Sequence, residues 1–166
     1  MPVTTSGQAG FAWLTFALIS VVMWGMYGVF LHMGQTSMAD SDNGRYKAFL
    51  FVGIAYFLTA VIFPLAILKI NNATWSFQTA GMTWSLAAGI LGAIGAFCVL
   101  LAFGAKGSPS VVMSIVFAGA PVVNAVAATI AHPPPGGWLA IRWQFVAGIL
   151  LAALGGSLVT FYRPQA

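Results

Sequence analysis

The stretch Trp84–Phe103 reads WSLAAGILGAIGAFCVLLAF, and its twenty residues include no Asp, Glu, Lys or Arg. Four other stretches of similar length also lack all four residue types: Phe11–Leu31, Ala48–Leu68, Val111–Ile130 and Phe145–Phe161. A helix needs about 17–25 apolar residues to cross the hydrocarbon core of a bilayer. Because no water is available there to pair the backbone, such a run folds as a helix. The sequence therefore predicts five transmembrane helices.

The composition supports this prediction. Hydrophobic residues make up 60% of the 166 residues and charged residues only 5%, and the mean hydropathy is +0.95. A water-soluble domain of this size leaves about a third of its surface exposed, so it could not hide this many apolar side chains. All eight charged residues lie outside the five stretches: Asp40, Asp42, Arg45, Lys47, Lys69, Lys106, Arg142 and Arg163. We predict an all-α integral membrane protein, a five-helix bundle forming one membrane domain over residues 1–166.

The basic residues bear on orientation. Lys69 and Arg142 would lie on the N-terminal side of the membrane, and the other four Lys and Arg residues on the opposite side. Because Lys and Arg are enriched in cytoplasmic loops, this balance favours an outside N-terminus and a cytoplasmic C-terminus in the cell (inner) membrane. Four against two is a small difference, so insertion in both orientations stays open.

The fourth stretch carries the most informative polar residues. Ser110, Ser114, Phe117, Pro121 and Asn124 follow at spacings of three and four, which places them on one helical face. Proline lacks an N–H and displaces the carbonyl four residues earlier. One interpretation is a substrate site at a broken helix, as in transporters. The alternative is a kinked helix whose Ser and Asn side chains bond to neighbouring helices.

Polar aromatic residues mark the first two stretches. Trp24 and Tyr27 lie in the first, and Tyr56 and Thr59 share one face of the second, followed by Pro64. Such rings bind apolar or cationic ligands and also form hydrogen bonds, which suits a substrate path. The alternative is that they fill space or anchor helix ends at the headgroups.

The third and fifth stretches are rich in small residues. Two sets recur every four residues: Ala88, Gly92 and Ala96 in the third, and Gly148, Ala152 and Gly156 in the fifth. Small residues at this spacing let membrane helices approach closely. We therefore predict that these positions pack helices together, either within the bundle or in a dimer.

Several kinds of site are missing from the sequence. The stretches hold no carboxylate that could couple transport to ions and no Arg that could pair with an anionic substrate. The single cysteine, Cys98, excludes an intrachain disulfide. No catalytic pair, metal cluster or phosphate loop can be assembled, and the basic residues form no nucleic-acid-binding patch. We expect no enzymatic activity, no cofactor, no metal and no nucleic-acid partner.

The chain resembles the drug/metabolite transporter superfamily, and within it the EamA-like five-helix domain. The resemblance rests on the Trp24-Gly25 pair, on Trp84–Phe103, on Lys106–Ala128 (KGSPSVVMSIVFAGAPVVNAVAA) and on the final QFVAGILLAALGGSLV. Most members have two five-helix halves in inverted orientation and move small metabolites by alternating access. The resemblance implies that Trp24 and Gly25 belong to a cavity-lining helix and that Pro121 breaks the fourth helix.

Two departures from that family pattern concern carboxylates. A Glu common after the fourth helix is replaced here by Ala131-His132-Pro133-Pro134-Pro135, and the first helix lacks the Glu of the small multidrug-resistance members. These differences disfavour proton-coupled drug export.

The leading functional hypothesis is a half-size transporter for a small neutral or cationic metabolite. It would act as a dimer with a second copy or with a paralogous five-helix partner, because antiparallel pairing supplies the inverted repeat that one chain lacks. The alternative is a structural or accessory subunit of a larger membrane complex. A channel would need a polar ring or filter motif, and the sequence shows neither.

Overall fold

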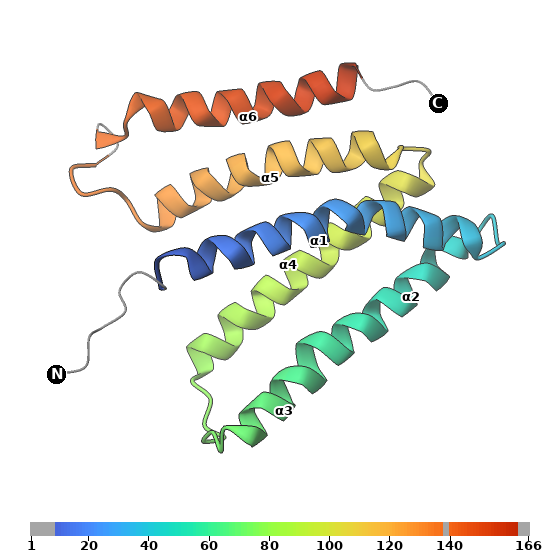
Figure 1. Ribbon diagram of the computed structural model, residues 1–166, viewed down its shortest axis with the longest axis horizontal. Coiled ribbons are helices and arrows are strands. Elements are labelled where there is room, and N and C mark those ends of the chain that lie inside the picture. The colour runs from blue at the N-terminus through green and yellow to red at the C-terminus, as the bar shows by residue number, and fades with distance from the viewer. Residues whose placement is uncertain (1–8, 138–139, 163–166) are drawn as a thin grey trace. The chain divides into compact units, whose positions relative to one another are not determined.

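The computed structural model describes residues 9–137 and 140–162, and these residues form helices and connecting turns without a strand. The elements in chain order are α1 (Ala9–Ser37), α2 (Gly44–Phe57), the π-helical turn η1 (Leu58–Ile62), α3 (Phe63–Ile70), α4 (Thr79–Gly104), α5 (Pro109–Ala131) and α6 (Trp143–Phe161) (Figure 1). Arg163 and Trp138 lie outside the described residues.

Five helical segments of the described chain are long and apolar enough to cross a membrane, which confirms the predicted number. All five extend beyond the predicted bounds, and the extension is largest in the first three. The first reaches Ser37, the second begins at Gly44, and the third begins at Thr79. The sequence criterion looked for residues that suit hydrocarbon, whereas a helix can continue through polar residues once it has left the hydrocarbon. The prediction therefore marked the apolar part of each helix rather than its ends.

The second apolar helix is a composite of α2, η1 and α3. Its middle turn is wider than an α-helical turn, because the backbone N–H of Phe63 donates to the carbonyl of Leu58, five residues earlier. Pro64 follows at once and has no N–H to donate. The proline therefore removes one backbone hydrogen bond next to the turn where the hydrogen bonds span five residues instead of four.

Clustering of the contacts divides the chain into two compact units, residues 1–104 and 105–166, and each is described separately. In the first unit α1, α2 and α4 contact one another in every pairing. Its buried apolar residues are Leu31, Ala48, Ala96, Val99, Leu100 and Phe103. These residues belong to the second half of α1, the start of α2 and the second half of α4, so the packed core lies at one end of the unit (Figure 1).

The second unit is a pair of helices, α5 and α6, that pack side by side (Figure 1). They are in tight contact at Gly156. A Cβ atom added there would overlap the Cβ of Ala118 and would lie 3.3 Å from the carbonyl oxygen of Ser114. Only glycine therefore fits between α6 and α5 at this point.

The other predicted packing residues are not all in contact with a neighbouring helix. Ala96 is buried in the core of the first unit, whereas Ala88 and Ala152 are exposed. Cβ atoms added at Gly92 and Gly148 would meet no atom within 4 Å. Within the described chain, each small-residue stripe therefore contacts a neighbouring helix at one end and is open over the rest of its length.

We expect Gly156→Ala to lower the melting temperature of the purified protein in detergent. The added methyl group must push α6 away from Ala118, and overpacking of this kind costs about 1–3 kcal/mol. Gly155→Ala is the matched control, because it adds the same methyl group to open space on the same helix. The control should be neutral or stabilising, since alanine favours helix by up to about 1 kcal/mol over glycine. Equal effects of the two changes would contradict the close contact.

Candidate functional site

The eight residues predicted to line a substrate path divide equally between the two units. Trp24, Tyr27, Tyr56 and Thr59 lie in the first unit, and Ser114, Phe117, Pro121 and Asn124 lie in the second. Their assembly into one path therefore stays a prediction, and the two groups are considered in turn.

An aromatic cluster of the first unit joins α1 to α2. The ring centroids of Trp24 and Tyr27 are 5.4 Å apart. The hydroxyl oxygen of Tyr27 is buried and has no hydrogen-bond partner among the described residues. The phenol of Tyr56 is close enough to interact with it electrostatically, and the Tyr56 side chain is 46% exposed. The cluster therefore places an unpaired polar group beside the accessible ring of Trp24, with the Tyr56 phenol within electrostatic range.

Thr59 lies on the irregular turn η1, one helical turn after Tyr56. Its hydroxyl donates to the carbonyl of Ala55 at 2.8 Å, which adds a hydrogen bond to the backbone just before the π-helical turn. Single π-helical turns inside α-helices occur frequently at functional sites. Pro64 hinted at an irregularity here, but the sequence did not reveal its form.

The polar face of α5 is more regular than predicted. The helix runs without interruption from Pro109 to Ala131 with Pro121 inside it, so the expected break at Pro121 was wrong. The hydroxyl of Ser114 donates to the carbonyl of Ser110 at 2.6 Å, which pairs it within its own helix. This local pairing also differs from the alternative, in which Ser114 would bond to a neighbouring helix.

The same helix presents different residues to α6 and to its surroundings. Ala118, Val122 and Ala125 are partly covered, whereas Pro121 and Asn124 are exposed. The Asn124 amide has no hydrogen bond to any residue of the described chain. Phe117 is 39% exposed. Phe117, Pro121 and Asn124 therefore belong to the more open part of the helix and are available to another helix or to a ligand, whereas Ser114 is partly covered.

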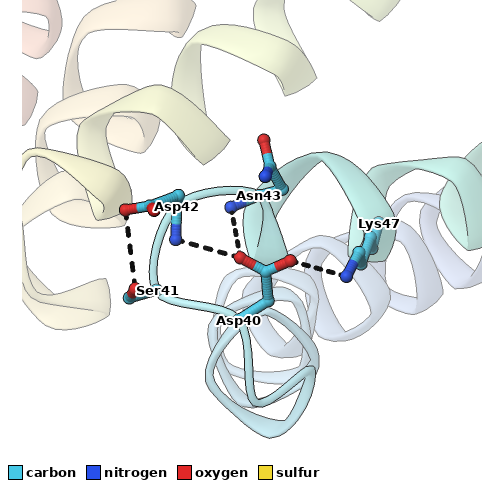
Figure 2. Close-up of polar contacts among 5 residues, drawn as sticks. All are labelled: Asp40, Ser41, Asp42, Asn43 and Lys47. Carbon is cyan, nitrogen blue, oxygen red and sulfur yellow. Dashed lines mark hydrogen bonds and ion pairs between the residues drawn. The ribbon is translucent and has the colours of Figure 1, made fainter.

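A polar network in the turn between α1 and α2 was not singled out from the sequence (Figure 2). Asp40 is its centre. One carboxylate oxygen accepts the backbone N–H of Asn43 at 2.8 Å and that of Asp42 at 3.1 Å, and the other accepts Lys47 at 2.5 Å. An aspartate that bonds to the backbone two and three residues later favours a turn. The spacing of Asp40 and Asn43 before an apolar run was the available signal.

The network changes the acidity of Asp40. The hydrogen bond from Lys47, and next the backbone bonds from Asn43 and Asp42, hold the pKa of this carboxyl below its ordinary value. The pKa is lower in the folded protein than in the unfolded chain, where it is about 3.9. The ionised carboxylate therefore stabilises the folded turn at pH values above this unfolded pKa. This contribution is lost as the pH falls through the lowered pKa of the folded state.

An open polar pocket of about 510 Å³ lies beside this network, still within the first unit. The pocket is lined by Gln35, Thr36, Ala39, Asp40, Ser41, Arg45 and Gly104. These residues come from the end of α1, the turn, the start of α2 and the last residue of α4. The pocket therefore lies at the packed end of the unit.

The described residues contain no cluster of three or more His, Cys, Asp or Glu side chains that could hold a metal ion. Comparisons of the chain with known protein families, with curated proteins and with solved structures find no match. The function is therefore inferred from the geometry of the residues themselves.

We expect Lys47→Met to raise the pKa of Asp40 toward its ordinary value, because the change removes the strongest interaction that favours the carboxylate. The measurement is a pH titration of aspartate carboxyl carbons by NMR in detergent micelles, with Asp40→Asn used to assign the signal. Lys69→Met removes the same charge from the last turn of α3 and should leave the titration unchanged. A pKa of Asp40 that does not respond to Lys47→Met would contradict the ion pair.

Proposed function

We propose that this chain is a multi-pass membrane protein and the half-size subunit of a small-solute transporter of the drug/metabolite type. The observation that carries the proposal is the aromatic cluster of Trp24, Tyr27 and Tyr56, with its buried and unpaired hydroxyl. The resemblance of the sequence to EamA-like domains supports the same function.

The exposed apolar surface supports insertion into a membrane. Large apolar side chains are uncovered on every helix, for example Phe11 at 71%, Leu91 at 71% and Phe161 at 82% exposure. Soluble monomers rarely expose contiguous apolar patches larger than a few hundred Å². A surface of this kind is stable when lipid chains or other apolar helices cover it.

The polar groups within the apolar helices support a solute path. A buried hydroxyl without a partner costs about 1–3 kcal/mol, and irregular backbone at membrane depth is tolerated where it lines a cavity or is buried in protein. Water or a solute beside Tyr27 would pair the hydroxyl and reduce this cost. Neutral or cationic solutes suit the site, because aromatic faces attract cations and the five uncharged stretches hold no Lys or Arg.

The open small-residue stripes support pairing with another five-helix chain. Gly92 and Gly148 have free space beside them, so a partner helix could approach their backbones closely. A second copy or a paralogue in inverted orientation would complete a transporter with two related halves. The same stripes would also suit an accessory subunit of a larger complex, which is the second candidate function.

We expect proteoliposomes that contain the protein to take up at least one member of a panel of labelled quaternary ammonium ions and neutral sugars. Tyr27→Phe should lower the rate about tenfold, since loss of a hydrogen bond worth about 1.4 kcal/mol has that effect. Trp24→Ala and Asn124→Ala should also lower it. Tyr162→Phe removes a hydroxyl from an 82% exposed ring and should have no effect. Absence of transport, or rates that none of the three changes alters, would contradict the proposal and favour the accessory role.

Antiparallel pairing of identical copies requires that the chain inserts in both orientations. A reporter fused to the C-terminus should then be detected on both sides of the membrane. Adding two Lys residues to the turn between α1 and α2 should bias the reporter toward the cytoplasm, because basic residues hold a loop inside. A single orientation of the unmodified chain would exclude the antiparallel homodimer and leave a paralogue as the inverted partner.

A further inference from the structure

The polar pocket at the end of the first unit contains a cation without a partner. Arg45 lies in the first turn of α2 and lines the pocket. Its guanidinium rests against Gly104, so that a Cβ atom added to Gly104 would overlap it. Among the described residues its one specific contact is with the ring of the adjacent Tyr46, whose centroid is 5.5 Å away. All five N–H donors of the guanidinium are therefore free to bind a ligand.

The carboxylate in the same pocket is already occupied. Asp40 accepts Lys47 on one oxygen and two backbone N–H groups on the other. Asp42 accepts a weak bond from Ser41 at 3.5 Å and forms no ion pair with Arg45. The pocket thus combines an acid that is already ion-paired with a base that forms no ion pair, which favours an anion over a cation.

The end of α4 compensates Arg45 only in part. The C-terminus of a helix carries a partial charge of about −0.5 from its unpaired carbonyls, and Gly104 is the last residue of α4. This leaves about half of the positive charge of Arg45 unbalanced. No hydrogen bond joins the guanidinium to the carbonyls of α4 in the described chain.

The neighbouring side chains contribute further polar groups. Gln35 lines the pocket, and its side-chain oxygen is buried without a partner among the described residues. Since the oxygen and nitrogen of an amide exchange places by a half turn, Gln35 can present its N–H donors instead. The hydroxyl of Thr36 is already directed to the carbonyls of His32 and Met33, at 3.0 Å each.

We propose that this pocket binds the phosphate group of a phosphate ester. The guanidinium of Arg45 matches two phosphate oxygens through a pair of parallel N–H bonds, and Gln35 supplies an additional donor. The cavity of about 510 Å³ accommodates a phosphate with a small substituent. The ester can be the headgroup of an anionic lipid or a soluble metabolite, because both present the same group. The proposal does not depend on transport.

The lipid source is tested by native mass spectrometry of the whole chain in detergent. The probes are phosphatidylglycerol and diacylglycerol with the same acyl chains, which differ by the phosphoglycerol headgroup. The soluble source is tested by calorimetric titration with glycerol 1-phosphate, with glycerol as its control. We expect the phosphate form to bind more tightly in at least one of the two pairs.

Four variants connect this binding to the pocket. Arg45→Gln should weaken it about tenfold or more, as expected for loss of a bidentate charged contact, and Arg45→Lys should restore only part of it. Gly104→Ala should also weaken it, because the methyl group displaces the guanidinium while every charge remains. Lys69→Gln removes one positive charge from the last turn of α3, which does not line the pocket, and should leave binding unchanged. Circular dichroism checks that each variant keeps its helices.

The two probe pairs separate the sources. Arg45-dependent binding of phosphatidylglycerol without binding of glycerol 1-phosphate identifies a lipid headgroup site. Arg45-dependent binding of glycerol 1-phosphate identifies a site for soluble esters. The proposal is overturned by phosphate preference in neither pair, by binding that Arg45→Gln leaves intact, or by an equal effect of Lys69→Gln, which would indicate nonspecific attraction.

Discussion

The need to pair every backbone polar group within the chain governs this structure. Five stretches without a formal charge leave the backbone no partner but itself, and the result is five helical segments with short turns between them. Against this regular background the few exceptions stand out. The ladder slips at η1 beside Pro64, and the Tyr27 hydroxyl is buried without a partner. Such exceptions are costly in an apolar environment, and the proposed function gives them a role as the places where a solute would interact with the chain.

The first unit is packed differently at its two ends. Its apolar core lies where the end of α1, the start of α2 and the end of α4 meet, and the Asp40 network and the Arg45 pocket lie at the same end. Packing around Leu100 and Phe103 makes this end the best-supported part of the unit, so the polar side chains there are held on fixed elements. The aromatic cluster of Trp24, Tyr27 and Tyr56 lies away from this core, where the helices cover one another less.

Contacts between helices depend on single small residues rather than on whole stripes. Gly156 is in close contact with Ala118, whereas Gly148, two turns earlier on α6, has open space beside it. The same contrast separates buried Ala96 from exposed Ala88 on α4. The spacing of small residues identifies a helix face that permits close packing, but it does not determine how much of that face one chain covers. The uncovered part is the area where a second five-helix chain would add the most contact.

The amino-acid sequence by itself determined the number of helices and their apolar extents, because both follow from runs of residues without charge. It also indicated the irregularity near Pro64, since proline cannot donate an N–H. It misjudged Pro121, around which α5 continues unbroken, because a single missing hydrogen bond does not end a helix whose other turns remain paired. Only the tertiary structure decided which polar groups lack a hydrogen-bond or ion-pair partner. Tyr27 and Tyr56 are 29 positions apart, and Arg45 and Gly104 are 59 apart, so their proximity depends on how α1, α2 and α4 pack. The spacing of residues within one helix does not determine that packing.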